Sequence, residues 1–460
     1  MPCRCRSKYR SATAATGTPP IEMTGERAAV AVLGAGLTGL SASLHLTRSG
    51  VAHRLFEREA VAGGHAVTLE EQGFRFDRTG HLLHLRDPEL QALALELLPA
   101  ERYRKLLRRS AVFSHGVYTR YPFQSNAYGL PPEVAYECVS GFLAAHFAPA
   151  SPQAEPKSFA DFCLQHFGPG ISRHFMLPYN SRLWGVAPDE ITSDWCQRFV
   201  PLPKVEDVLR GALGAQPPEL GYNVNFWYPE LGIGAFSAAL AERTPVELSR
   251  APQHIDRARR VLVFASEEVP FDVLVSTIPL PALLRLLGDL PPAVAKAASR
   301  LRSTHLHYLD VALSAPNQNP YHWIYVPEDK YPFYRVGCYS HFSEKLAPPG
   351  KSSLYVELAD RRSQTPERAF ASALPGLTEL GLVKSARDVE FFRLRTLEHA
   401  YVIYDHHYRA ALDVIEPFLA QQRIISSGRY GAWNYSSMED ALLMGRSAAR
   451  DAAALLRGEP

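Results

Sequence analysis

The stretch AAVAVLGAGLTGL, residues 28–40, decides the fold. Its first six residues are apolar and typical of a buried strand, and residues 34–39 have the spacing G-x-G-x-x-G. Residues 40–48 have helical character, and residues 51–56 predict a second strand. A strand, a glycine turn, a helix and a second strand in this order predict a βαβ unit that binds a dinucleotide.

The glycine turn and the acid that follows it predict how the dinucleotide is held. Glycines in such a turn let the backbone approach a pyrophosphate, and the N-terminus of the helix stabilises its negative charge. Glu57 ends the second strand, 18 residues after Gly39, where a carboxylate accepts hydrogen bonds from the adenosine ribose. We therefore predict cofactor contacts from Gly34, Gly36, Leu37, Thr38, Gly39 and Glu57.

A glycine doublet distinguishes FAD from NAD as the cofactor. Gly63-Gly64 follows soon after Glu57, and residues 73–81 are typical of a strand that enters another glycine turn. Both features resemble the family of FAD-dependent amine oxidases and their relatives, in which the doublet passes close to the flavin. The resemblance implies FAD as the cofactor and adds contacts from Arg58, Gly64, His65, Gly80 and His81.

The composition excludes several classes of protein. The chain has 460 residues with 49 Lys and Arg against 47 Asp and Glu, so its balanced charge predicts no nucleic-acid partner. Six scattered cysteines are unlike a secreted disulfide framework and favour a cytoplasmic location. No stretch reaches about 18 apolar residues, so we expect no membrane insertion. Residues 1–25 are typical of a disordered leader and lack the apolar core of a signal peptide.

The remaining patterns predict an α/β fold of three parts. Helical spacing dominates residues 131–213, whereas short apolar runs after residue 260 predict strands of a mixed or antiparallel sheet. We expect a discontinuous Rossmann-like FAD-binding domain, a helical insertion and a sheet that binds the substrate. The expected boundaries are a leader at 1–25, the FAD domain at 26–86, 215–300 and 413–460, the insertion at 87–110 and 130–214, and the substrate sheet at 111–129 and 301–412.

Six segments, taken in order, resemble UDP-galactopyranose mutase, more the eukaryotic than the bacterial type. The resemblance runs from about residue 30 to residue 449, which is nearly the whole chain beyond the leader. The segments are TGH at 79–81, YPFQSN at 121–126, PYNSRLW at 178–184, YVPED at 325–329, PFYR at 332–335 and GRYGAWNY at 428–435.

This resemblance implies an isomerase that interconverts the pyranose and furanose rings of a nucleotide sugar without net redox. UDP-galactose is the default substrate, and the biological role would be cell-surface glycan biosynthesis. In that family, N5 of reduced FAD attacks the anomeric carbon, displaces the nucleotide diphosphate and forms a flavin–sugar iminium before the ring recloses. NAD(P)H or another donor would reduce the flavin through the same cleft, because the sequence holds no second dinucleotide fingerprint.

Two arginines and three tyrosines would hold the leaving diphosphate. The resemblance assigns Arg198 and Arg335, and a guanidinium suits bidentate contacts with phosphate. It also assigns Tyr325, Tyr401 and Tyr435, whose hydroxyls donate hydrogen bonds without titrating at neutral pH. The alternative interpretation is structural, with surface salt bridges for the arginines and core packing for the tyrosines.

An aromatic and amide cluster would recognise the nucleobase. By the resemblance, Tyr121 and Phe123 provide aromatic faces, while Gln124 and Asn180 read the edge of the base. A packed aromatic turn is the alternative interpretation of this segment. The resemblance adds further substrate contacts from Tyr179, Trp184 and Asn225.

His81 and Arg429 would shape the environment of the reduced flavin. The resemblance places His81 in the loop beside the flavin, although a histidine near a glycine turn can be purely structural. Arg429, Tyr435 and the start of the final helix at Met438 would lie near the N1/O2 edge and stabilise the anionic reduced form. The residues assigned to the reaction itself are His81, Arg198, Arg335, Tyr325, Tyr401 and Tyr435.

The histidine pairs do not predict a metal site. His81 with His84, His305 with His307 and the doublet His406-His407 lack acids or thiols at a known ligand spacing.

Two glycine turns depart from the mutase pattern. Residues 228–234 read YPELGIG, in which Leu231 displaces the first glycine, and Thr79 stands where the family has glycine. The displaced glycine predicts an altered backbone path near the substrate.

Two other functions are compatible with the sequence. An FAD oxidoreductase of the amine oxidase or protoporphyrinogen oxidase type would need an apolar or amine-binding cavity and no diphosphate arginines. A flavin-binding protein without catalysis would keep the fold while its substrate motifs decayed. The nearly complete set of motifs favours the mutase, and the sequence does not indicate the oligomeric state.

Overall fold

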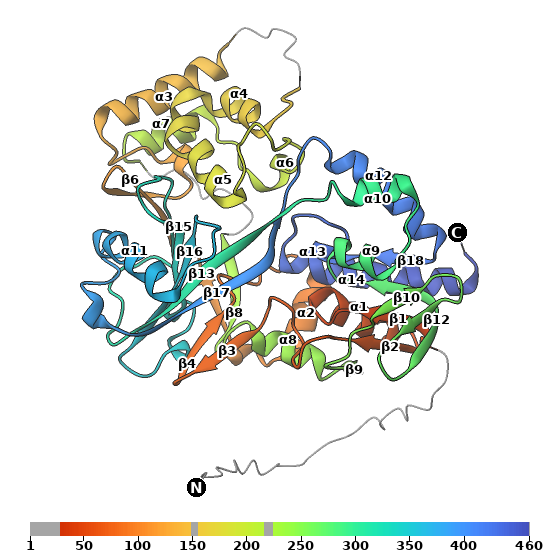
Figure 1. Cartoon of the computed structure of the whole chain (residues 1–460). Coiled ribbons are helices and arrows are strands. Elements are labelled where there is room, and N and C mark those ends of the chain that lie inside the picture. Colours follow the sequence, from red (N-terminus) through yellow and green to blue (C-terminus); the bar gives the residue numbers. More distant parts are fainter. Residues whose placement is uncertain (1–27, 149–154, 216–223, 460) are drawn as a thin grey trace.

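Two sheets and a group of helices make up the structure (Figure 1). The computed structural model describes residues 28–148, 155–215 and 224–459. In Figure 1 the first sheet lies at the right and the second at the left, with the helices of residues 132–212 above the second sheet.

The first sheet is built on the predicted βαβ unit, which is confirmed. Its strands are β1 (Ala28–Leu33), β2 (His53–Phe56), β9 (Val246–Glu247), β10 (His254–Asp256), β11 (Val261–Val263), β12 (Glu268–Ser276) and β18 (Ile424–Ser426). The order is β10-β11-β12-β1-β2-β9, with β18 beside β12. Among these described strands, β11 pairs antiparallel with β10 and with β12, and the other pairs are parallel. The central strand β1 is apolar on both faces because both are covered.

Two helices pack against each other beside the first sheet, α1 (Leu37–Arg48) and α14 (Met438–Arg457). They cross closely at Gly445, where a Cβ atom would lie 2.3 Å from the carbonyl oxygen of Thr38. Ser437 begins α14 with a capping box, as the sequence predicted. The last helix is thereby fixed over the glycine turn that opens α1.

The second sheet is mixed, which confirms the prediction for this part of the chain. Its strands are β6 (Ser110–Ser114), β7 (Val117–Arg120), β13 (Ser303–Leu313), β14 (Trp323–Tyr325), β15 (Phe333–Cys338), β16 (Ser352–Leu358) and β17 (Val389–Val402). They lie in the order β17-β13-β16-β15-β14-β6-β7, and only β6 and β14 pair in parallel among them.

The two faces of the second sheet differ in chemistry. One face is apolar and packs on α11 (Pro366–Glu379). Its central row consists of Leu309, Ile324, Val336 and Val356. The opposite face is polar and aromatic, because successive side chains of a strand point to opposite sides. Its matching row consists of Tyr308, Tyr325, Arg335 and Glu357.

The helical group crosses itself tightly. Its members are α3 (Pro132–His146), α4 (Phe159–Ile171), α5 (Leu177–Trp184), α6 (Cys196–Phe199) and α7 (Val205–Ala212). A Cβ atom at Gly170 would lie 2.1 Å from the carbonyl oxygen of Glu137, so glycine sets the distance between α3 and α4. A π-helical turn at Ser172–Met176 leads from α4 into α5, and such turns are frequent at functional sites.

Two short ribbons lie where the two sheets meet (Figure 1). One pairs β3 (Thr68–Glu71) with β4 (Phe74–Asp77), and the other pairs β5 (Tyr103–Leu107) with β8 (Asn225–Pro229). The remaining α-helices are α2 (Pro88–Leu97), α8 (Gly234–Ala241), α9 (Leu280–Leu286), α10 (Pro292–Ala298), α12 (Tyr408–Gln421) and α13 (Gly428–Gly431). The domain boundaries proposed from the sequence stay a prediction.

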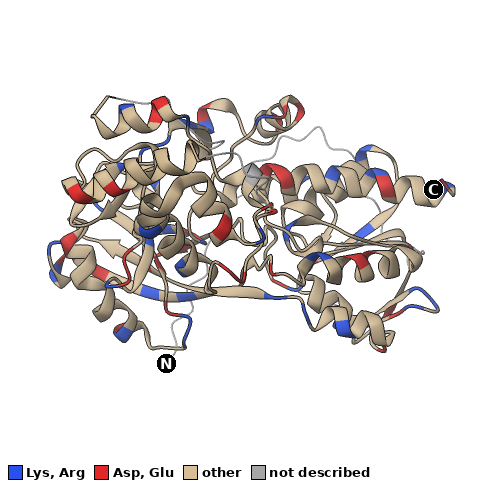
Figure 2. Ribbon diagram, turned by 90° about the horizontal axis from the view of Figure 1, so that it is seen from above, with Lys and Arg blue, Asp and Glu red and all other residues tan. Residues whose placement is uncertain are grey.

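Figure 2 shows Lys and Arg positions interspersed with Asp and Glu positions along the described part of the ribbon. Within the described ranges, none of the helices combines the length and the apolar character needed to cross a membrane. The expected leader lies outside the described residues.

Candidate active site

The glycine turn after β1 and the later glycine doublet pack directly on each other. The amide of Gly63 donates to the carbonyl of Ala35 at 2.8 Å. A Cβ atom at Gly64 would lie 3.1 Å from the Cα atom of Gly36. Gly34 has a φ of +92°, and a Cβ atom there would lie 2.7 Å from the hydroxyl of Thr277. The structure thus brings three predicted cofactor residues together in one backbone cradle.

Glu57, the acid predicted to bind the ribose, lies beside this cradle. Glu57 is buried, and its carboxylate accepts hydrogen bonds from the amides of Ala35 at 2.7 Å and Glu59 at 3.0 Å. Its orientation is therefore fixed by the backbone on both sides. Arg58 has a different environment, because its side chain is exposed and pairs with Glu59 at 3.0 Å.

A third segment closes the cradle from the C-terminal part of the chain. Gly428 has a φ of +86°, and a Cβ atom there would lie 2.5 Å from the hydroxyl of Thr38 in α1. Arg429 follows it and donates to the carbonyls of Ala400 at 2.9 Å and Ser436 at 2.7 Å. These bonds hold the start of α14 against the end of β17, with the buried Nε of Arg429 left without a partner among the described residues.

Two neutral histidines lie beside this arginine. Burial, followed by the charge of Arg429, lowers the pKa of His81 to about 4. Burial, followed by His81 itself, lowers the pKa of His65 to about 3. The Nδ1 atoms of both rings are buried and have no partner among the described residues. Both histidines are therefore uncharged at neutral pH and have an unused ring nitrogen.

The loop that carries His81 is anchored by Asp77, a residue that the sequence analysis did not select. Its buried carboxylate accepts hydrogen bonds from the hydroxyls of Thr68 and Tyr228, each at 2.6 Å, and from the amide of Ile233 at 3.2 Å. Its carbonyl accepts from the hydroxyl of Tyr339 at 2.6 Å. Asp77 thus joins β4, β8 and the turn before α8, so that the loop begins from a fixed point.

The two departures from the glycine pattern have visible consequences in this region. Thr79 has a φ of +67°, a left-handed conformation that a β-branched residue rarely adopts. In the other turn, Gly232 has a φ of +100° and a Cβ atom there would lie 2.4 Å from the hydroxyl of Thr68. The shifted glycine therefore still occupies a position that requires glycine. Gly80 faces the second sheet, where its Cβ atom would lie 2.6 Å from the hydroxyl of Tyr355.

Arg335 is the central charged residue on the polar face of the second sheet. Its Nη2 lies 2.7 Å from both carboxylate oxygens of Glu357, its register partner on β16. The same nitrogen donates to the hydroxyl of Tyr401 at 3.1 Å. Arg335 exposes 22% of its side chain, Glu357 exposes none, and Nε of Arg335 has no partner among the described residues. The guanidinium is therefore fixed by Glu357 and Tyr401, while part of the Arg335 side chain stays exposed.

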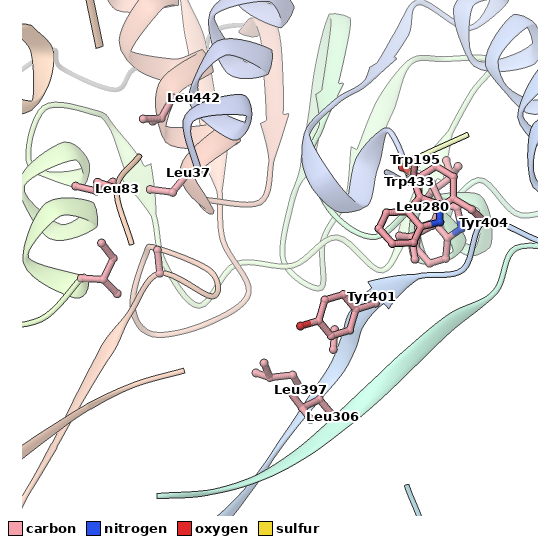
Figure 3. Packing of buried hydrophobic residues seen from close by; sticks show 14 of the residues in the cluster. Leu37, Leu83, Trp195, Leu280, Leu306, Leu397, Tyr401, Tyr404, Trp433 and Leu442 are labelled. Atoms are coloured by element: carbon pink, nitrogen blue, oxygen red, sulfur yellow. The ribbon is translucent and has the colours of Figure 1, made fainter. Parts of the chain in front are cut away.

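Two aromatic residues predicted for substrate binding lie beside Tyr401. The ring of Tyr401 lies 5.5 Å from that of Trp184 and 6.0 Å from that of Tyr435. Arg429 lies 4.7 Å from the ring centre of Tyr435, which links this group to the flavin side of the site. Burial raises the pKa of Tyr401, so its hydroxyl remains protonated. Figure 3 shows that hydroxyl pointing away from the packed rings of Trp195, Tyr404 and Trp433.

The aromatic residues predicted to bind the nucleobase form one cluster. Tyr121 stacks on Tyr325 at 4.6 Å, and Phe123 stacks on Phe175 at 5.0 Å. Tyr179 packs on both Phe175 and Tyr325. The sequence missed Phe175, which lies in the π-helical turn before α5.

The two amides of this region have partners within the protein. Gln124 is buried and its Nε2 donates to the carbonyl of Pro201 at 2.9 Å. Nδ2 of Asn180 donates to the carbonyl of Met176 at 2.8 Å. Each amide oxygen is left as the acceptor for another donor.

Two predicted residues are not brought into this arrangement by the described contacts. Arg198 lies in α6, but its side chain is outside the described part of the structure. Asn225 opens β8 with an exposed side chain, and its carbonyl accepts from Nδ1 of His84 at 2.9 Å. Met438, by contrast, is the first residue of α14, as expected.

No group of three or more His, Cys, Asp or Glu side chains among the described residues could hold a metal ion. Two of the histidines in the pairs considered above bond to backbone carbonyls. His305 bonds the carbonyl of Arg361 at 2.6 Å, and His406 bonds the carbonyl of Asp189 at 3.0 Å.

Comparison with known proteins defines the class. The family of flavin-containing amine oxidoreductases matches residues 37–453, and the chain belongs to that family. Within it the fold is similar to a crystal structure of reduced UDP-galactopyranose mutase, with 25% identity, a TM-score of 0.85, and coverage of 93% of this chain and 95% of that one. The predicted resemblance to a mutase within the amine oxidase group is therefore confirmed at the level of the fold.

Other solved structures share this fold with lower similarity. A putative protoporphyrinogen oxidase from Exiguobacterium sp. 255-15 has 15% identity, a TM-score of 0.72, and coverage of 94% of this chain and 99% of that one. A putrescine oxidase variant has 15% identity, a TM-score of 0.64, and coverage of 92% and 98%. At these identities the similarity shows the fold alone.

The curated relatives match only a short stretch. A phytoene dehydrogenase from Streptomyces griseus is 48% identical over 58 residues, which are 13% of this chain and 11% of that protein. The pyridine nucleotide-disulfide oxidoreductase domain-containing protein 2 of Mus musculus is 48% identical over 60 residues, 13% of this chain and 10% of that protein. The matches thus span about a tenth of these relatives, and their activities do not transfer to this chain.

Proposed function

We propose that this protein is an FAD-dependent mutase that interconverts the pyranose and furanose forms of a nucleotide sugar, with UDP-galactose as the default substrate. The observation that carries the proposal is Arg335. It is a guanidinium that contacts Glu357 and Tyr401 and keeps 22% of its side chain exposed, on the sheet face that meets the His81 loop. The similarity to the reduced mutase structure supports the same function.

The residues around the cradle fit an FAD molecule. Gly36 and Gly64 leave room for a pyrophosphate at the N-terminus of α1, and Glu57 is fixed where the ribose would lie. The unpaired ring nitrogen of His81 and Nε of Arg429 are then available to the isoalloxazine. When bound and reduced, FAD would supply the nucleophile for the anomeric carbon.

Arg335 would bind the diphosphate before and after it leaves the sugar. A departing diphosphate carries about two negative charges, and a fixed guanidinium stabilises the charge that develops on it. Because Nη2 is committed to Glu357 and Nε is buried, a phosphate oxygen would meet the part of the side chain that stays exposed. Arg198 is proposed as the second phosphate contact on the resemblance alone.

The tyrosines would complete the diphosphate site as neutral donors. The hydroxyl of Tyr401 accepts from Arg335, so its own proton is free to be donated to a phosphate oxygen. Tyr435 lies beside it, and Tyr325 is the register partner of Arg335 on β14. These residues would bind the leaving group without adding a charge that must titrate during turnover.

The aromatic cluster would orient the nucleoside part of the substrate. Tyr121, Phe123 and Tyr179 give the walls, and the free oxygens of Gln124 and Asn180 could accept from a nucleobase N–H. Trp184 would contact the sugar. Asn225 remains a proposed sugar contact from the resemblance.

His81 would act as a neutral hydrogen-bonding residue rather than a charged one. Its lowered pKa leaves the ring uncharged at neutral pH, so it does not compete with Arg429 for the negative charge of a reduced flavin. Arg429 lies close enough to His81 to lower its pKa and would stabilise that charge.

The test is turnover of UDP-galactofuranose by the purified protein with and without dithionite, followed by chromatography of the sugar nucleotide. Conversion to the pyranose form only under reducing conditions is expected. The absence of conversion in both states would remove UDP-galactose as the substrate, and other nucleotide sugars would be assayed next. Replacement of dithionite by NADPH or NADH tests the physiological reductant.

An FAD-dependent oxidoreductase of the amine oxidase type is the second candidate. The aromatic walls formed by Trp184, Tyr401 and Tyr435 would suit an organic cation. The partly exposed guanidinium of Arg335 would repel such a substrate, which favours the mutase. Hydrogen peroxide release on addition of amines, with no isomerisation of sugar nucleotides, would reverse this preference.

A further inference from the structure

Glu357 has no role in the function proposed from the sequence, yet it is the closest charged neighbour that the structure gives to Arg335. Its carboxylate lies 2.7 Å from Nη2 through both oxygens, and its side chain has no exposed surface. Arg335 exposes 22% of its side chain. A ligand can therefore reach the arginine without touching the acid.

The position of Glu357 follows from the strand register. Arg335 and Glu357 are directly opposite on β15 and β16, so they share one face of the sheet. All seven residues of β16 are buried, and Glu357 is the one charged residue in its sequence SSLYVEL. A buried carboxylate is costly unless it is paired, so its presence here requires the partner that Arg335 provides.

Such a pair has a consequence for anion binding. In the free protein Glu357 neutralises Arg335 and keeps a partly buried cation stable. When a diphosphate arrives, the arginine is shared between two anions, and Glu357 repels the ligand across the guanidinium. The internal acid therefore competes with the external anion for the same cation.

We propose that Glu357 is a positioning residue that acts through Arg335 and lowers the affinity of the site for the nucleotide diphosphate, so that the leaving group is bound but remains exchangeable. This inference rests on the proposed function, because it takes the diphosphate as the ligand of Arg335. A purely structural role for Glu357 predicts the opposite sign, since loss of a structural contact weakens binding.

The substitution that separates the two roles is Glu357→Gln. Glutamine keeps the size of the side chain and one oxygen that can accept from Nη2, but it removes the negative charge. The guanidinium then lacks its counter-charge until a diphosphate supplies one. UDP should bind about tenfold more tightly than to the wild type, and it should raise the melting temperature of the variant more than that of the wild type.

A matched control lies on the same sheet face. Asp310 on β13 is also fully buried and pairs with Arg395 at 2.5 Å rather than with Arg335. Asp310→Asn therefore removes a buried carboxyl group from a different pair. Its affinity for UDP should equal that of the wild type, even where its stability falls.

The experiment is isothermal titration of the FAD-loaded wild type, Glu357→Gln and Asp310→Asn with UDP. Tighter binding by the Glu357 variant alone supports the proposal. Equal or weaker binding by Glu357→Gln, or tighter binding by both variants, overturns it. If Glu357→Gln does not fold, Glu357→Asp decides in its place, because it withdraws the charge by one methylene and should bind UDP more tightly than the wild type.

The wild-type titration distinguishes this failure from failure of the proposed function. UDP binding by the wild type together with an unchanged Glu357→Gln affinity overturns the role of Glu357 and leaves the nucleotide site standing. A wild type that binds neither UDP nor inorganic pyrophosphate overturns the diphosphate site, and the role of Glu357 falls with it.

Discussion

Gly64 lies against Gly36, so closely that a Cβ atom on Gly64 would be 3.1 Å from the Cα atom of its neighbour. The contact joins the glycine turn of the first βαβ unit to the doublet that follows β2. Gly64 also has a φ of +59°, which adds backbone strain to any side chain placed there. We expect Gly64→Ala to lose FAD at least about tenfold more readily than the wild type, as measured by flavin retention during dialysis.

The control for this prediction is another glycine with a similar conformation. Gly50 has a φ of +69°, but a Cβ atom there would have no neighbour within 4 Å. Gly50→Ala should carry the same kind of strain and retain FAD. Equal loss of FAD from both variants would show that the backbone conformation, and not the contact with Gly36, is responsible.

Thr79 gives a second prediction, about stability. At its φ of +67° a glycine is relaxed and an alanine is strained, so the usual order of the two residues should be reversed. We expect Thr79→Gly to be more stable than Thr79→Ala by about 1 kcal/mol in urea unfolding. Both variants lose the hydroxyl and the methyl group of the threonine and differ only by one Cβ atom, so packing contributes little to the difference.

A helical position provides the reference for the Thr79 pair. Ala144 is exposed within α3, and Ala144→Gly should cost about 1 kcal/mol there. If Thr79→Ala is instead the more stable variant of its pair, the left-handed conformation assigned to Thr79 is wrong.

The local parts of this fold could be read from the sequence, and the long-range parts could not. The βαβ unit was predictable because the tight turn and its close packing require glycine at Gly34, Gly36 and Gly39. The strand β17 was not predicted because its sequence carries Arg393 and Arg395 within the apolar run. The hydrophobic pattern therefore shows neither the strand nor its partner. That strand becomes plausible only when its charges are seen to pair with Glu71 and Asp310.

The same distinction applies to the candidate site. Arg335 could be selected because it lies in a recognisable segment, PFYR at 332–335. Glu357 could not, because its meaning depends on which residue lies opposite it on the neighbouring strand. Asp77 is similar, since its hydrogen-bond partners Tyr228 and Ile233 come from more than 150 residues further along the chain.

The lowered pKa values of His65 and His81 predict a dependence of stability on pH. Their folded pKa values, about 3 and about 4, lie below the ordinary value of 6.5, so the unfolded chain binds more protons between these limits. The contribution of these two histidines to the free energy of unfolding should therefore fall as the pH falls from 6.5 to about 4. Allowing for partial exposure, each histidine contributes about 2 kcal/mol to this loss.

Urea unfolding of the holoenzyme at a series of pH values measures this effect. The double variant His65→Gln/His81→Gln should lose less stability between pH 6.5 and 4 than the wild type. His254 is exposed on β10, and His254→Gln should leave the slope unchanged. An identical slope in all three proteins would contradict the assignment of the two histidines as neutral groups.

Arg335→Lys separates the charge of the diphosphate site from its geometry. Lysine keeps a positive charge beside Glu357, so the buried acid is not left uncompensated, which would otherwise cost about 3–5 kcal/mol. Lysine does not reproduce the planar guanidinium that contacts Glu357 and Tyr401 and that would also contact a phosphate. Turnover should fall about 100-fold, while the flavin absorption spectrum and FAD content stay those of the wild type.

Arg395→Lys, on the same face but paired with Asp310, should stay within a few-fold of wild-type turnover. Full activity in Arg335→Lys would mean that charge alone suffices at this position, and that the leaving group does not depend on the guanidinium fork.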